Sequence, residues 1–180
     1  AGDGYALSNT RALLERGWTG DLYDGDPRGA KDVQRAWIDR EWAAKPVPQS
    51  CNYLNIDIDG NDYHILKALL GAWTEQGFDM PDLITAEYNP IFAREEAVVM
   101  PYNAKHTWNN DTYYGMSLAA CEKLGKEFGY QLIHLHGGIN AFLLRDDHAA
   151  TFSELFGDLN YEIKYGHKPH PPEKEWTRLN

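Results

Sequence analysis

Short apolar runs alternate along the chain with segments in which apolar residues recur every three or four positions. The short runs predict buried strands, because Gly, Pro, Asn or Asp residues bound them. In order, they are "LYD" within "GDLYDGDP", "CNYLNIDI", "DLITAEY", "YQLIHL" and "NAFLLR". The last two runs flank "HGGI", which predicts that they form an antiparallel pair.

The segments between the runs predict helices. A short first helix is expected between Ser8, a suitable N-cap, and Gly17, a suitable end. An exposed amphipathic helix is expected over residues 28–42, and a second helix over residues 115–129. The clearest helical spacing is that of Ile65, Leu66, Leu69, Leu70 and Trp73, with Gly77 as the end.

Strands that alternate with helices predict an α/β fold with a mainly parallel sheet and a C-terminal antiparallel strand pair. The length of 180 residues suggests one domain over residues 1–156, followed by a polar surface tail over residues 157–180. In parallel sheets, ligands bind beyond the carboxyl ends of the strands. Asp24, Asp57 and Glu87 each end a predicted strand. The sequence therefore predicts one cleft lined by these carboxylates.

Charge and cysteine content narrow the classes of partner. Seventeen basic and 27 acidic residues give a net charge of −10, which argues against nucleic acid and membrane surfaces as partners. No apolar run approaches the roughly 20 residues that span a bilayer. The two cysteines, Cys51 and Cys121, lie far apart, which favours free thiols in a reducing cytoplasm over a disulfide.

The stretch "YLNIDIDGNDYHIL" has the densest set of polar groups at a strand end. Asp57 and Asp59 end the strand, and Asn61 or Asp62 can cap the helix that follows. An EF-hand calcium loop needs a glycine at position six and a glutamate at position twelve. Here the glycine is fourth and the twelfth residue is Ala68, so this interpretation is rejected.

The same stretch resembles the signature of haloacid dehalogenase-like phosphatases, Asp-x-Asp-Gly-Thr. In that signature the first aspartate is the nucleophile and the second is the acid/base, which fits Asp57 and Asp59. Thr85 would imitate the second motif, and Asp146 and Asp147 the magnesium-binding motif. An asparagine replaces the signature threonine and no lysine is clearly placed, so the phosphatase stays an alternative.

A long segment without clean periodicity, residues 89–114, is rich in Pro, Asn, Tyr and Trp. Loops of this length in a compact domain are usually functional or disordered, and the aromatic content argues against disorder. Aromatic rings that stack and amides that hydrogen-bond suit the recognition of sugars or other polyhydroxyl compounds. The candidate substrate residues are Asn89, Trp108, Tyr113 and Tyr114.

Three histidines raise the question of a metal site. His106, His134 and His136 could join Glu87 as ligands, and the second and third share one face of a predicted strand. No pair has the spacing of an HExxH-type zinc motif, and histidines on a strand face are more commonly solvated or hydrogen-bonded. No metal is therefore assigned.

Taken in order, these motifs resemble the FkbM-type class I S-adenosylmethionine-dependent methyltransferases. In that family a glycine-containing turn leads into a helix, as in "AGDG" here, and a "GW-x-G" introduces a strand that ends in an acidic residue and proline, as in "GWTGDLYDGDP". An apolar strand then enters Asp-x-Glu/Asp-Gly, here "LNIDIDG", and a later strand ends in an acidic residue, here "LITAEYNP". The resemblance covers residues 1–90 by motif and the rest by topology.

The resemblance implies a Rossmann-like methyltransferase fold and S-adenosylmethionine as cofactor. Gly2, Asp3 and Gly4 would then contact the methionine part of the cofactor, Asp24 the ribose diol, and Asp57 the region beside the sulfonium. Relatives methylate hydroxyl oxygens, so O-methylation of a sugar, glycan or small metabolite is expected. The candidate catalytic residues are Asp57 and three possible bases, Asp59, Glu87 and His106.

Two departures from the family pattern bear on this interpretation. The family's first strand should precede Ala1, and its third strand with a helix should lie between Asp24 and Asp57, where only one helix and a proline loop are visible. The expected fold therefore lacks the first and third strands. Besides the phosphatase, a non-catalytic carbohydrate-binding or interaction module on this fold stays open.

Overall fold

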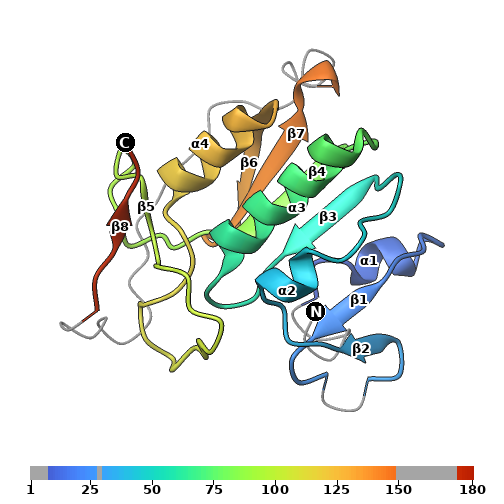
Figure 1. The fold of residues 1–180 in the computed structure, drawn as a ribbon, viewed down its shortest axis with the longest axis horizontal. Coiled ribbons are helices and arrows are strands. Elements are labelled where there is room, and N and C mark those ends of the chain that lie inside the picture. Colours follow the sequence, from blue (N-terminus) through green and yellow to red (C-terminus); the bar gives the residue numbers. More distant parts are fainter. Residues whose placement is uncertain (1–7, 28–29, 149–173) are drawn as a thin grey trace.

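A four-stranded mixed sheet forms the centre of the protein (Figure 1). The computed structural model describes residues 8–27, 30–148 and 174–180. The strand order is β3-β4-β7-β6, and the strands are β3 (Tyr53–Ile56), β4 (Leu83–Glu87), β6 (Tyr130–His136) and β7 (Asn140–Arg145). Strand β4 is parallel to β3, whereas β7 runs antiparallel to both of its neighbours, β4 and β6. The mixed α/β class and the C-terminal antiparallel pair are thus confirmed. The mainly parallel sheet is wrong, because β7 inserts antiparallel between β4 and β6 and leaves only the β3–β4 pairing of this sheet parallel.

Two small sheets flank the central one. Strand β1 (Leu22–Asp24) pairs in parallel with β2 (Val33–Arg35), and β1 points the same way as β3 in both ribbon figures. Strand β5 (Val98–Val99) pairs antiparallel with β8 (Thr177–Arg178). The last described residues of the chain are therefore hydrogen-bonded to the segment that follows β4.

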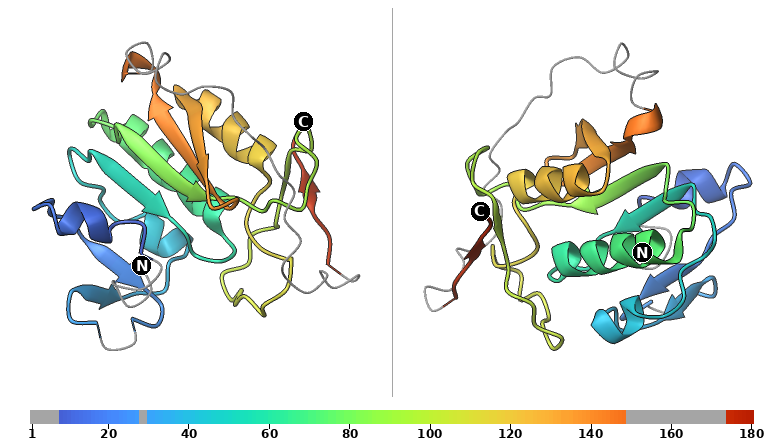
Figure 2. Two further views of the ribbon diagram at one scale, coloured as in Figure 1. Left: turned by 180° about the vertical axis from the view of Figure 1, so that it is seen from behind. Right: turned by 45° about the horizontal axis from the view of Figure 1, so that its top comes forward.

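The two longest helices, α3 (Asp62–Gln76) and α4 (Leu118–Glu127), cover the same face of the central sheet (Figure 2). The core between helices and sheet includes Leu66, Leu70, Ile84 and Leu143, all buried. Both helices were predicted from their apolar spacing. In the described part of the chain, no helix is long and apolar enough to cross a membrane.

Both cysteines are free, as the sequence predicts.

The predicted helix over residues 28–42 is wrong. The segment instead contains β2 and a short helix, α2 (Arg40–Ala43), which Asp39 caps by accepting a hydrogen bond from the Trp42 amide (2.9 Å). Of the predicted apolar face, Val33 is buried but the Trp37 side chain is 49% exposed. Pairing with the backbone of β1 therefore outweighs the weak helical pattern, as tertiary context often outweighs local propensity.

This correction also changes the expected fold. The sequence pattern shows no strand between Asp24 and Asp57, yet β2 lies in that interval. The remaining short helix, α1 (Arg11–Leu14), lies between Ser8 and Gly17 as predicted, but its N-cap is Thr10 rather than Ser8.

Two glycines, one within α3 and one at its end, should respond to alanine substitution with opposite changes in stability. Gly77 ends the helix with φ of 65°, a left-handed conformation that costs an alanine about 1 kcal/mol. Gly71 lies within the helix, and nothing lies within 4 Å of the place where a Cβ would be added. We expect Gly77→Ala to lower the free energy of unfolding by about 1 kcal/mol and Gly71→Ala to raise it by about 0.5–1 kcal/mol in urea denaturation. Shifts of the same sign would contradict the assigned helix end.

Candidate functional site

Three carboxylates meet at the carboxyl edge of the parallel strands. Asp57 directly follows β3, Glu87 is the last residue of β4, and Asp59 lies in the turn between β3 and α3. One carboxylate oxygen from each lies within 4.8 Å of the other two. The structure thus brings together three of the four candidate catalytic residues.

The turn that presents Asp57 and Asp59 is held by Asp62, the first residue of α3. The Asp62 side chain is fully buried, and its two oxygens accept hydrogen bonds from the amides of Ile58 and Gly60, both at 2.8 Å. Asp59 has a φ of 55°, a left-handed conformation that is uncommon outside glycine. The buried carboxylate therefore fixes a turn that would otherwise be unfavourable.

Burial and mutual repulsion raise the pKa values of the carboxyl groups at this edge. The pKa of Glu87 is raised well above its usual range by burial first, and then by Asp62, Asp57 and Asp59. Burial also raises the pKa of Asp57, with further contributions from Asp59 and Asp24. Burial raises the pKa of Asp62 to about 7, against the opposing effect of its backbone hydrogen bonds.

One atom of this cluster lacks a partner. In the described part of the chain, the Oε2 atom of Glu87 is buried without a hydrogen bond, although the side chain is only 7% exposed. Buried polar atoms are nearly always hydrogen-bonded, so an exception needs an explanation. The hydroxyl of Tyr114 lies close enough for Glu87 to contribute, after burial, to the raised pKa of that phenol.

The aromatic segment 89–114 packs onto the same turn. Asn61 or Asp62 was expected to cap α3. Asn61 is the N-cap residue, but its side chain makes two hydrogen bonds to the backbone of Asn103, at 2.8 and 3.1 Å, rather than to the helix. The His106 ring lies against Gly60, where an added Cβ would come within 2.3 Å of Cδ2. Burial lowers the pKa of His106, and its Nε2 atom is buried without a hydrogen bond in the described residues.

The candidate substrate residues occupy different environments. Asn89 is fully buried and donates to the carbonyls of Thr112 (2.8 Å) and Tyr114 (3.0 Å), so its side chain holds the segment in place. The Trp108 indole donates to the Asp111 carbonyl at 2.9 Å, and Tyr113 contacts the Trp176 ring edge-on. Trp108 and Tyr113 remain partly exposed, whereas Tyr114 is buried.

The structure describes two of the five candidate cofactor residues, Asp24 and Asp57. Asp24 ends β1, accepts a hydrogen bond from the Asp26 amide at 2.7 Å, and acts electrostatically on Asp57. The acidic ends of β1, β3 and β4 therefore face one region, as the strand pattern predicts. Gly2, Asp3 and Gly4 lie outside the described residues.

The residues of the phosphatase motifs do not join the three carboxylates. Thr85 is buried within β4 and bonded to the Tyr53 hydroxyl. Asp146 and Asp147 follow β7, next to Asp82, at the opposite end of β4, which is a strand length of about 16 Å away.

His134 and His136 lie on β6, two strands away from β4. His136 ends β6 at the same edge of the sheet as Glu87, because both pair with Asn140 of β7.

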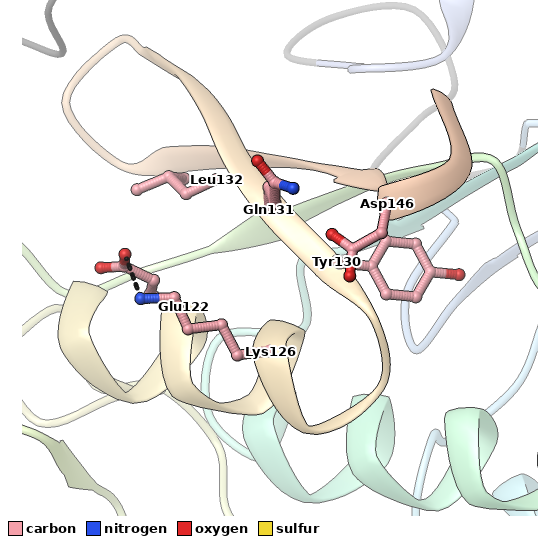
Figure 3. Close-up of a pocket in the computed structure, with 6 residues that line it drawn as sticks. All are labelled: Glu122, Lys126, Tyr130, Gln131, Leu132 and Asp146. Carbon is pink, nitrogen blue, oxygen red and sulfur yellow. Dashed lines mark ion pairs between the residues drawn. The ribbon is translucent and has the colours of Figure 1, made fainter. Parts of the chain in front are cut away.

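A pocket of about 410 Å³ also lies at that opposite end of the sheet (Figure 3). Its lining residues are Glu122, Lys126, Tyr130, Gln131, Leu132 and Asp146. The first two form an ion pair at 3.0 Å. This pocket is open and polar, and it includes none of the candidate catalytic, cofactor or substrate residues. It is therefore not taken as the candidate site.

Comparison with known proteins adds no relative: no family model, no curated protein and no solved structure matches the chain.

A substitution of Asn89 tests whether its role is structural. Asn89→Ala would leave two buried carbonyls without their donor, so we expect the free energy of unfolding to fall by about 1–3 kcal/mol. Asn109→Ala, an exposed position in the same segment, should change it by less than about 0.5 kcal/mol. Urea denaturation measures both. Equal stability of the two variants would mean that Asn89 does not hold the segment.

The buried acids also predict how stability depends on pH. The pKa of Glu87 is higher in the folded chain than its ordinary value of 4.5. The neutral carboxyl therefore costs no stability below pH 4.5, and stability is lost as pH rises through the folded pKa, because the buried group must then ionise. A glutamine cannot ionise, so Glu87→Gln should gain stability relative to the parent between pH 5 and pH 8. Urea denaturation in buffer with a chelator measures this, with the exposed Glu95→Gln as control. A difference independent of pH would contradict the raised pKa.

Proposed function

We propose that the protein is an S-adenosylmethionine-dependent methyltransferase that transfers the methyl group to a hydroxyl oxygen. The observation that carries this proposal is the gathering of Asp24, Asp57 and Glu87 at the carboxyl ends of β1, β3 and β4. In parallel α/β sheets, ligands bind at the carboxyl ends of the strands, and β3 and β4 form such a parallel pair here. The order of the motifs along the chain, which resembles that of FkbM-type methyltransferases, supports S-adenosylmethionine as the cofactor.

The charges and hydrogen-bonding groups of the residues at this edge suit S-adenosylmethionine. S-adenosylmethionine supplies an electrophilic methyl group on a positively charged sulfur. Asp57, a half-buried carboxylate among other acids, would face that positive charge. Asp24 would accept hydrogen bonds from the ribose hydroxyls, for which a carboxylate has two suitable oxygens. Strand β2, which the sequence pattern does not show, supplies a strand between these two aspartates, where the family has one.

Exposure distinguishes the candidate bases. An acceptor that enters from solvent can reach Asp59, which is exposed. His106 is less suitable, because its Nε2 atom is buried against Gly60. Glu87 lies at the buried floor of the cluster. We therefore assign the removal of the hydroxyl proton to Asp59, since a base must lie within hydrogen-bond reach of its proton.

Hydroxyl groups of an acceptor would meet the aromatic segment beside this edge. Tyr113 and Trp108 are partly exposed and belong to a segment that is bonded to the turn through Asn61 and Asn103. Rings of this kind suit the apolar faces of sugars. A sugar or glycan is therefore the acceptor class that we propose.

The arrangement gives less support to the phosphatase alternative. That activity needs the second motif and the magnesium-binding acids beside Asp57. Thr85 is instead bonded within the sheet, and Asp146 and Asp147 lie at the other end of β4.

Isothermal titration calorimetry with S-adenosylmethionine and S-adenosylhomocysteine tests the proposal. We expect the 180-residue chain to bind both. Asp24→Asn should weaken both about 10-fold or more, because a hydrogen bond to a charged group contributes about 1.5–3 kcal/mol. Asp57→Asn should weaken S-adenosylmethionine more than S-adenosylhomocysteine, because only the former carries the positive sulfur.

Asp146→Asn, at the far end of the sheet, is the matched control and should leave both affinities unchanged. Absence of binding at millimolar ligand, or an equal loss in the control variant, would sink the proposal. Magnesium-dependent release of phosphate from an aryl phosphate, abolished by Asp57→Asn, would support the phosphatase instead.

A further inference from the structure

We propose that Asp57, Asp59 and Glu87 together bind one divalent cation of the oxygen-preferring class, such as Mg²⁺, Mn²⁺ or Ca²⁺. The sequence alone led us to assign no metal to this chain. The cation site goes beyond the proposed methyltransferase, because it requires no organic cofactor. It rests on the geometry of the three carboxylates and on one unpartnered atom.

The donor geometry suits a single ion. One oxygen from each of the three side chains lies within 4.8 Å of the other two. Opposite ligands are about 4.2 Å apart across Mg²⁺ and about 4.6–5.2 Å apart across Ca²⁺. The three oxygens therefore already lie within, or close to, the span of one coordination shell. Carboxylate oxygens are the ligands that these hard cations prefer.

The unpartnered oxygen of Glu87 is the second observation. This side chain is 7% exposed, it contributes to the same cluster, and its Oε2 has no hydrogen-bond partner among the described residues. The charged groups that act on Glu87 are all carboxylates. A buried charge needs an opposite charge or a metal. A cation between the three side chains would supply a partner for this oxygen and a positive charge beside the three acids.

The cluster is also held in place before any ion arrives. Asp62 fixes the turn through the amides of Ile58 and Gly60, both at 2.8 Å, so its own oxygens are already in use and it serves as a positioning residue. Glu87 is fixed by the β4 ladder, where it pairs with Asn140 of β7. Ligands that are oriented by surrounding hydrogen bonds bind metals more tightly.

The site is open on one side. Asp59 is exposed whereas Glu87 is buried, so an ion would enter past Asp59 and keep its outer coordination positions for water or hydroxyl groups. A cation-bound hydroxyl loses its proton more readily, which would assist methylation at oxygen. This last role rests on the proposed function, whereas the binding of the cation does not.

Titration of the chain with Mn²⁺, followed by the loss of the free-ion electron paramagnetic resonance signal, tests the site. We expect saturable binding of one ion per chain, displaced by Mg²⁺ or Ca²⁺. Glu87→Gln and Asp57→Asn should each weaken Mn²⁺ binding about 10-fold or more. Replacing a residue that only hydrogen-bonds to a metal ligand already lowers metal affinity by about 10-fold, and these two residues are ligands themselves. Asp59→Asn, at an exposed position that folding should tolerate, should weaken binding similarly.

The control is again Asp146→Asn, which should bind Mn²⁺ like the parent chain. Non-saturating binding, or equal affinity in Glu87→Gln and Asp146→Asn, would overturn the site and indicate general attraction to the acidic surface. If Glu87→Gln does not fold by circular dichroism, Asp59→Asn decides the question by the same criterion. Saturable Mn²⁺ binding without any S-adenosylhomocysteine binding would uphold the cation site and overturn the methyltransferase.

Discussion

The carboxylate of Asp62 determines the shape of the candidate site. It lies fully buried at the start of α3 and accepts hydrogen bonds from the amides of Ile58 and Gly60. Together these bonds reverse the chain directly after β3 and hold Asp59 in a left-handed conformation. Both Asp57 and Asp59 thereby face Glu87 on the neighbouring strand. The sheet supplies Glu87, but the turn decides that the three acids meet.

Bringing these acids together is electrostatically unfavourable in the isolated chain. Burial and mutual repulsion raise the pKa values of Asp57, Asp62 and Glu87, and one oxygen of Glu87 has no partner in the described residues. Strained or unsatisfied arrangements of this kind concentrate at functional sites. A positively charged ligand would relieve the repulsion. The sulfonium of the proposed cofactor and a divalent cation are both ligands of this type, and both would lie beside Asp57.

Strand ends and long helices could be predicted from the sequence, because apolar spacing and terminal acids are local signals. The alignment of Asp24, Asp57 and Glu87 followed from the alternation of strands and helices. Strand β2 could not be predicted, because its stability comes from pairing with β1 rather than from its own residues. The roles of Asn61 and Asn89 were also hidden, since both side chains bond to backbone at least 20 residues away in sequence. The sequence places Asp57 and Glu87 in one cleft, but it does not show the turn that brings the Asp59 carboxylate to them, so the proposed cation site was not predicted.

A nuclear magnetic resonance titration of the ¹⁵N-labelled chain with S-adenosylhomocysteine would test the central claim, that function resides at the acidic strand ends. The amides of Asp24 and of the turn around Asp57 to Asp62 should shift most, and those around the pocket between α4 and β6 should stay unchanged. Shifts concentrated at Glu122, Lys126 and Gln131, or none at saturating ligand, would contradict the account.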